Sequence, residues 1–165
     1  MQLETEHLIM RDFREDDWPM LAAYWTDPRY QRFYPVNERQ EETVRTLVAS
    51  FVAAQAEQPR RKWQLALVMR DDGRLIGNCG IRVNDPELRE ANIGYELSPD
   101  YWGQGYASEA AQALVAWGFA QRDVRRIVAN CRADNVASIR VLEKAGLRQT
   151  GRDRDDLTWE IRAEA

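Results

Sequence analysis

The chain has 165 residues, a hydrophobic content of 44% and a formal net charge of −4. This length suits one domain, which buries roughly 70% of the surface of its unfolded chain. The acidic balance argues against a nucleic-acid-binding surface, and no apolar run approaches the ~20 residues that span a bilayer. Residues 1–11 lack the apolar core of a secretory signal. We therefore expect a cytoplasmic protein with no nucleic-acid or membrane partner.

The single histidine and the two cysteines narrow the possible chemistry. His7 lies in the first expected strand, while Cys79 and Cys131 fall in separate apolar runs. This scatter argues against a metal site and favours free thiols. Nucleophilic catalysis of the Ser-His or Cys-His type would have to use His7, and no glycine-flanked nucleophile turn accompanies it.

Strand-like and helix-like segments alternate along the chain. Apolar periodicity and turn residues predict strands at residues 3–11, 63–69, 75–83, 91–97, 126–131, 148–154 and 157–162, and helices at residues 15–25, 38–57, 107–121 and 136–145. No linker or repeat divides the chain. We expect one domain over residues 1–165, of the α/β (α+β) class, with about four helices and a mixed, mostly antiparallel, twisted sheet of about seven strands.

A glycine-punctuated turn joins the strand at 91–97 to the helix at 107–121. It includes Gly103, Gly105 and Ala107, which let the backbone approach a ligand without obstruction by a large side chain. The first amides of a helix have no internal partners, and the helix dipole favours negative charge there. The spacing fits neither a nucleotide P-loop nor a dinucleotide-binding Gly-x-Gly-x-x-Gly turn. We expect a phosphorylated ligand of another kind.

Three segments in order resemble the GNAT acetyltransferase superfamily. The turn resembles its pyrophosphate loop, Gln/Arg-x-x-Gly-x-Gly/Ala, matching at Gly105 and Ala107 and departing at Trp102. Residues 3–13, LETEHLIMRDF, resemble the opening strand of the branch that acetylates the N-termini (alanine) of ribosomal proteins. Residues 132–147, RADNVASIRVLEKAGL, resemble the second cofactor segment of that branch.

The resemblance implies a single GNAT-like domain whose central parallel strands, the fourth and fifth, splay apart. It implies acetyl-CoA as co-substrate, with pantetheine added to the strand at 91–97 and a backbone amide of Tyr95 or Leu97 facing the thioester carbonyl. The cofactor-binding residues it implies are Tyr95, Leu97, Trp102, Gly103, Gln104, Gly105, Tyr106, Ala107, Ser108, Asn135 and Ser138.

Glu96 is the candidate general base. Strand alternation puts it on the face opposite Ile93, Tyr95 and Leu97, beside the expected thioester. A carboxylate there is placed to accept an ammonium proton, directly or through water. The alternative is a partly exposed glutamate paired with an arginine such as Arg82 on the neighbouring strand.

Ser138 is the candidate general acid. Many members of the superfamily use a tyrosine on the helix after the fifth strand, but the corresponding residues 139–142 contain none. Ser138 is the nearest group that carries a proton, and the alternative is an ordinary serine in the first turn of a helix. Asn135 is expected to cap that helix and, by the resemblance, also to bind the pantetheine.

The aromatic residues between the first two helices are candidates for the acceptor pocket. They include Trp25, Tyr30, Phe33 and Tyr34, near acids such as Asp27 and Glu38 that would receive a cationic amine. Packing in the core is the alternative. An α-amine with a pKa of about 8 is already partly neutral at physiological pH, while a lysine side chain with a pKa of about 10.4 is almost fully protonated. A site with only Glu96 and Ser138 as candidate base and acid therefore suits an α-amine better than a lysine.

Two functions remain open from the sequence. One is an N-acetyltransferase that transfers an acetyl group to a primary amine, either a protein N-terminus or a small molecule, by direct attack. The other is a non-catalytic acyl-CoA-binding module or sensor on the same fold. The final hairpin has an edge through which two copies would form a homodimer.

Overall fold

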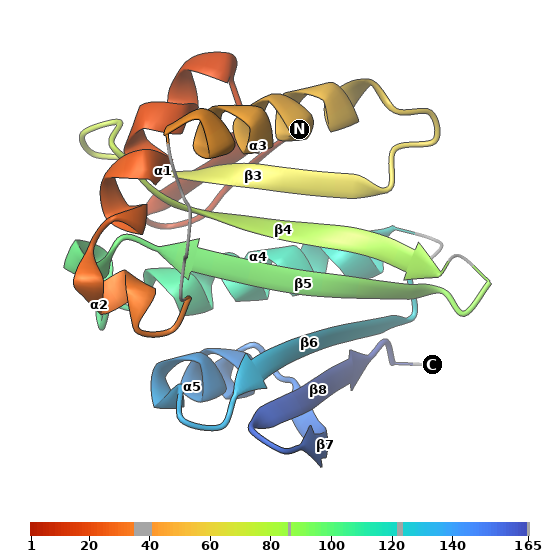
Figure 1. Ribbon diagram of the computed structural model, residues 1–165. Coiled ribbons are helices and arrows are strands. Elements are labelled where there is room, and N and C mark those ends of the chain that lie inside the picture. The colour runs from red at the N-terminus through yellow and green to blue at the C-terminus, as the bar shows by residue number, and fades with distance from the viewer. Residues whose placement is uncertain (35–40, 86, 122–123, 165) are drawn as a thin grey trace.

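One eight-stranded sheet with helices on both faces makes up the computed structural model (Figure 1), which describes residues 1–34, 41–85, 87–121 and 124–164. The strand order is β1-β2-β3-β4-β5-β6-β8-β7. The strands are β1 (Gln2–Glu4), β2 (Leu8–Asp12), β3 (Lys62–Met69), β4 (Leu75–Asp85), β5 (Glu90–Leu97), β6 (Arg126–Arg132), β7 (Arg148–Asp153) and β8 (Asp156–Arg162). The α-helices are α1 (Trp18–Trp25), α2 (Pro28–Gln31), α3 (Glu41–Ala53), α4 (Tyr106–Ala120) and α5 (Val136–Lys144). Short 3₁₀ turns are η1 (Glu15–Asp17), η2 (Ala54–Ala56) and η3 (Pro99–Tyr101).

The fold class is confirmed, and the structure adds one strand and one short helix to the expected elements. The expected strand at residues 3–11 is two antiparallel strands, because the Thr5 amide donates to the Leu8 carbonyl at 2.9 Å and closes a turn between them. The unexpected helix is α2, where the Asp27 side chain accepts from the Arg29 amide at 2.8 Å and caps the first turn. Glu38, one of the acids expected near the acceptor pocket, lies outside the described residues.

The parallel strands β5 and β6 pair over only a short length. Their ladder runs from Glu90 with Arg126 to Asn92 with Val128, and β6 then continues in register with β8 alone. Figure 1 shows β5 and β6 diverging toward the side where α5 lies. The expected splay of the central parallel strands is therefore confirmed. Beyond Asn92, one edge of β5 has no strand beside it among the described residues.

The sheet separates two hydrophobic clusters. On one face, Ile93 and Leu97 of β5 pack with Leu114 of α4, and all three are buried. On the other face, α1, α2 and α3 cover Ala66 and other residues of β3 and β4. The alternation expected for β5 is confirmed for its apolar residues, because Ile93 and Leu97 share one cluster. No helix within the described ranges is long and apolar enough to cross a membrane.

A substitution at Gly77 of β4 tests how tightly β4 packs against the end of β5. A Cβ added there would clash with the Glu96 carbonyl oxygen, which belongs to the backbone and cannot swing aside as the end of a flexible side chain can. We expect Gly77→Ala to lower the free energy of unfolding by about 1–3 kcal/mol, as overpacking does. Urea denaturation measures the change.

Gly94→Ala is the matched control for Gly77→Ala. It lies on the neighbouring strand, and its added Cβ would meet only Arg82 Nη1, at 4.0 Å. Equal destabilisation by the two substitutions would contradict the close packing described for Gly77.

Candidate active site

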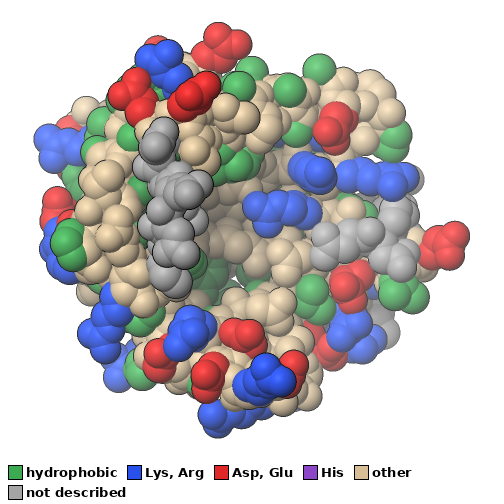
Figure 2. Space-filling view, in the orientation of Figure 1, with side chains coloured by type: hydrophobic (Ala, Val, Ile, Leu, Met, Phe, Trp, Pro, Cys, Tyr) green, Lys and Arg blue, Asp and Glu red, His purple; other side chains and the backbone are tan. Residues whose placement is uncertain are grey.

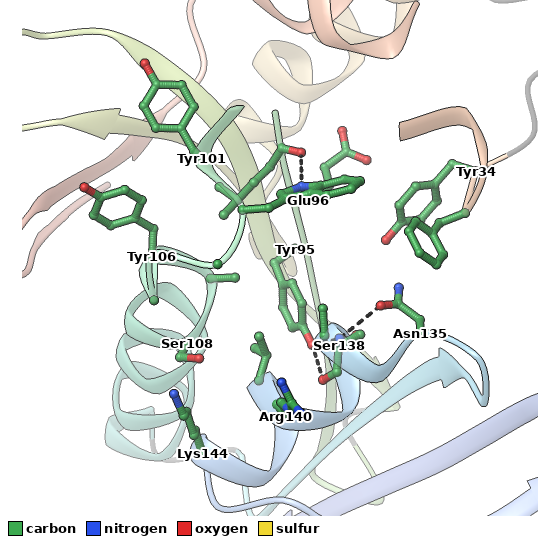
Figure 3. Close-up of a pocket in the computed structure, with 18 residues that line it drawn as sticks. Tyr34, Tyr95, Glu96, Tyr101, Tyr106, Ser108, Asn135, Ser138, Arg140 and Lys144 are labelled. Carbon is green, nitrogen blue, oxygen red and sulfur yellow. Dashed lines mark hydrogen bonds between the residues drawn. The ribbon is translucent and has the colours of Figure 1, made fainter. Parts of the chain in front are cut away.

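A cavity of about 270 Å³ lies where β5 and β6 diverge. The end of β5, the start of α4 and one side of α5 line it (Figure 3). A second cavity, of about 390 Å³, opens between β5 and β6. The two cavities share Phe33, Tyr34, Tyr95, Asn135 and Ser138, so they meet at the splay.

The first turn of α4 faces the first cavity. Gly105 precedes the helix with φ +90°, a left-handed conformation that glycine adopts without strain. Apart from the chain next to each glycine, no heavy atom of the described residues lies within 4 Å of a Cβ added at Gly103 or Gly105, so the backbone borders open space. All the expected cofactor-binding residues line this cavity except Gln104, whose side chain donates to the Asp100 carbonyl at 3.1 Å.

Trp102, which departs from the family's loop sequence, connects the loop to neighbouring residues. Its Nε1 donates to the Leu97 carbonyl at 2.9 Å, and its ring lies edge-on to Phe33 with centroids 6.0 Å apart. The indole therefore fastens the loop to the end of β5. The backbone of Gly103 and Gly105 is left to face the cavity.

Two cationic residues in the cavity wall were missed by the sequence reasoning. Arg140 and Lys144 are exposed on α5 and line the first cavity. Figure 3 shows both at the end of the cavity that lies away from Glu96. Neither takes part in an ion pair among the described residues. Their i, i+4 spacing on one helix, after the cap at Asn135, was the available signal.

Ser138 pairs with a tyrosine that reaches it from β5. The Ser138 Oγ lies 2.9 Å from the Tyr95 Oη, which also donates to the Ser138 carbonyl at 3.2 Å. Burial raises the pKa of Tyr95, so this hydroxyl keeps its proton. Asn135 Oδ1 accepts from the Ser138 amide at 3.1 Å and forms the expected cap. The sequence reasoning assigned Tyr95 only through its backbone and missed its side chain.

Glu96 accepts hydrogen bonds from four side chains. Tyr24 Oη, Trp25 Nε1 and Asn78 Nδ2 donate to Oε1 at 2.8, 2.9 and 2.6 Å. Tyr30 Oη donates to Oε2 at 2.5 Å. Arg82, the alternative partner, donates instead to Gln64 Oε1 at 2.6 Å. A carboxylate has about four acceptor positions, so Oε1 is saturated and Oε2 keeps one.

The aromatic residues divide into two groups. Trp25 and Tyr30 are buried, at 5% and 0% exposure, and reach the site by binding Glu96. Phe33 and Tyr34 line both cavities. Tyr34 stacks on Tyr30 with ring centroids 4.8 Å apart, which connects the two groups. Their expected role in substrate binding stays a prediction.

The arrangement combines a site for an anion with two groups able to move protons. The N-terminus of α4, the cations Arg140 and Lys144, and Glu96 and Ser138 all line the first cavity. Within the described ranges, no group of three or more His, Cys, Asp or Glu side chains could hold a metal ion. The groups present therefore support group transfer from an anionic carrier.

Removing the Glu96 carboxylate should destabilise the protein. Glu96→Ala removes the acceptor that four donors share, of which Asn78 Nδ2 keeps a bond to Tyr24 Oη at 3.1 Å, and a buried donor that is left unsatisfied costs about 1–3 kcal/mol. We expect a loss of at least about 3 kcal/mol in the free energy of unfolding, measured by urea denaturation. Glu96→Gln should lose only about 1 kcal/mol, because the amide keeps an oxygen. Equal losses in the two variants would contradict this account of the network.

Comparison with known proteins agrees with this geometry. The family model "Acetyltransferase (GNAT) domain" matches residues 7–148. The uncharacterized N-acetyltransferase YnaD of Bacillus subtilis is 32% identical over 92% of this chain and 85% of its own length. The structure of a GNAT-family acetyltransferase from Bacillus anthracis has a TM-score of 0.83 at 27% identity, covering 98% of both chains. RimL, a ribosomal L7/L12 α-N-protein acetyltransferase solved in complex with coenzyme A, has a TM-score of 0.83 and covers 98% of both chains; at 21% identity it shows the fold alone. The chain belongs to the GNAT family of N-acetyltransferases.

Proposed function

We propose that this protein transfers the acetyl group of acetyl-CoA to a primary amine by direct attack. The observation that carries the proposal is the cavity at the splay, which the N-terminus of α4, Glu96 and Ser138 line together. RimL, which has the same fold, was solved in complex with coenzyme A. Acetyl-CoA supplies the acetyl group already activated as a thioester.

The residues at the splay fit this co-substrate. The open space around Gly103 and Gly105 leaves room for a pyrophosphate against the first amides of α4. Arg140 and Lys144 add positive charge on the facing helix. The edge of β5 beyond Asn92, which pairs with no strand among the described residues, offers backbone groups to a peptide-like pantetheine arm. The amide of Tyr95 or Leu97 then faces the carbonyl as an oxyanion donor.

Glu96 serves as the general base in this proposal. Three donors occupy its Oε1, so Oε2 takes the proton from the acceptor's ammonium group. The Tyr30 hydroxyl, 2.5 Å from Oε2, holds this oxygen in place. Because the network is fixed before substrate arrives, the base needs no reorientation.

Ser138 serves as the general acid. As the C–N bond forms and the thioester C–S bond breaks, its hydroxyl donates a proton to the leaving thiolate, and the Tyr95 hydroxyl at 2.9 Å is positioned to relay a replacement proton from solvent. The second proton of the attacking nitrogen is released to solvent as the amide forms. Burial keeps Tyr95 protonated, since it raises the pKa of the phenol. The Asn135 cap fixes the first turn of α5 and with it the position of Ser138.

Calorimetric titration with acetyl-CoA tests the cofactor site. Gly105→Val should abolish the stoichiometric binding that the wild type gives, because a β-branched residue is strained at φ +90° and fills the space before α4. Gly73→Val is the matched control, since Gly73 also has a positive φ, +71°, and open space around it, but lies in the β3–β4 turn. Absence of binding to well-folded wild type would overturn the proposed function.

Steady-state kinetics test the base. Glu96→Gln should lower kcat roughly a hundredfold or more, the usual contribution of general-base catalysis, while the affinity for acetyl-CoA stays unchanged. Glu109→Gln is the control, because this carboxylate lies on α4 and pairs with His7 away from the cavity. An unchanged kcat in Glu96→Gln would remove Glu96 from the mechanism.

A further inference from the structure

We propose that the acceptor amine carries an anionic group, a carboxylate or a phosphate, which Arg82 binds on the sheet face beside Glu96. The inference rests on the proposed function, because it names the class of amine that this site accepts. It concerns the face of β4 and β5 that points toward α1 to α3, away from the cofactor cavity's helix α4. Nothing in the catalytic roles given above uses Arg82.

Arg82 is a partly buried cation without a carboxylate. Its Nη2 donates to Gln64 Oε1 at 2.6 Å, and its Nη1 lies 4.0 Å from where a Cβ of Gly94 would be. The side chain thus lies across Gly94 on the sheet surface. It takes part in no ion pair among the residues that the structure describes. A guanidinium has five N–H donors, so most of its donors remain for a ligand.

A second cation stands directly opposite Arg82. Lys62 of β3 is its register partner, is exposed, and also takes part in no ion pair within the described ranges. Like charges placed opposite each other on a sheet are destabilising. The partly buried arginines of other strands are paired with carboxylates, as Arg11 of β2 binds Asp17 and Arg126 of β6 binds Glu90. The positive charges of Arg82 and Lys62 therefore make this face suitable for binding an anion.

A chain of hydrogen bonds ties Arg82 to Glu96. Gln64 accepts from Arg82, and its Nε2 donates to Asn78 Oδ1 at 2.5 Å. Asn78 Nδ2 then donates to Glu96 Oε1 at 2.6 Å. Arginine only donates and a carboxylate only accepts, so the two ends dictate how both amides point. The cation and the base are thus held in one fixed arrangement.

Gly94 lies between the two charges and also lines the second cavity. Its register partner Gly80 is covered by the Gln64 side chain, while Arg82 Nη1 is the nearest side-chain atom that a Cβ added at Gly94 would meet. Gly94 and Glu96 share a face two residues apart, about 7 Å along the strand. Figure 2 shows a hollow in this side of the molecule, with lysine and arginine side chains along its rim. An acceptor lying over Gly94 would bring its amine to Glu96 and its anionic group to Arg82.

This charge arrangement distinguishes among possible acceptors. Polyamines and polycationic antibiotics would place a second positive charge against Arg82 and Lys62, which disfavours them. A peptide with an acidic residue next to its free α-amine, or a small amino acid whose carboxylate lies several bonds from the amine, fits both groups. The two sources share one chemistry, an amine with a nearby anion.

Bisubstrate conjugates test the anion site without requiring turnover. CoA is joined through an acetyl thioether linkage to the amine of Ala-Asp-amide, Ala-Asn-amide, Ala-Lys-amide or 4-aminobutanoate, and each conjugate is titrated calorimetrically. We expect the Ala-Asp conjugate to bind the wild type about tenfold more tightly than the Ala-Lys conjugate, as one charge-assisted hydrogen bond gives. The affinity of the 4-aminobutanoate conjugate distinguishes the two kinds of acceptor. Tighter binding than the Ala-Asp conjugate indicates a small-molecule acceptor, and weaker binding indicates a peptide.

The variant Arg82→Gln should reduce the Asp-to-Lys ratio to about twofold or less, because the glutamine carries no charge. Arg61→Gln, at an exposed arginine adjacent to Lys62, should keep the wild-type ratio. Thermal denaturation checks that both variants fold. Equal affinities on the wild type, or an unchanged ratio in Arg82→Gln, would overturn the anion site. Failure of CoA itself and of every conjugate to bind well-folded wild type would instead overturn the proposed function.

Discussion

The divergence of β5 and β6 is the constraint on which the rest of the site depends. Two parallel strands that paired along their full length would satisfy each other's backbone groups and close the sheet. Here the ladder ends at Asn92 and Val128, and α5 lies at the opening. Beyond Asn92, one edge of β5 therefore has no strand beside it in the part of the chain that the structure describes, and Tyr95 reaches Ser138 across the gap. The start of α4 borders the same opening, so a helix N-terminus and a free strand edge share one cavity.

The Glu96 network is the second organising interaction. Its donors come from α1, α2 and β4, so one carboxylate connects two helices to the sheet. Buried polar groups require partners, and this requirement fixes the wall of the site more strictly than apolar packing alone. The same network continues through Asn78 and Gln64 to Arg82. Stability and the placement of charge therefore have a common origin on this face of the sheet.

Features that depend on neighbouring residues could be predicted. Asn135 caps α5 by bonding an amide three residues away, and Gly105 precedes α4 in a left-handed conformation. The alternation of β5 follows from the two-residue period of a strand. The turn at Thr5, which divides the expected first strand into β1 and β2, is also formed by residues close in sequence. It was not predicted, because the apolar residues on both sides of the turn fit one continuous strand. Arg140 and Lys144 had a recognisable helical spacing, although their place in the cavity wall required the position of α5 against α4.

The sequence by itself determined the family, the order of the elements, the loop before α4 and the apolar face of β5, because these features arise from short-range periodicity and capping. Only the tertiary structure decided what surrounds Glu96, since Tyr30 and Tyr24 lie 66 and 72 residues from it in the chain. It also decided that Tyr95 meets Ser138 and that Arg82 meets Gln64 instead of Glu96. Such contacts depend on strand order and on how far two strands separate, and no local pattern in the chain encodes either.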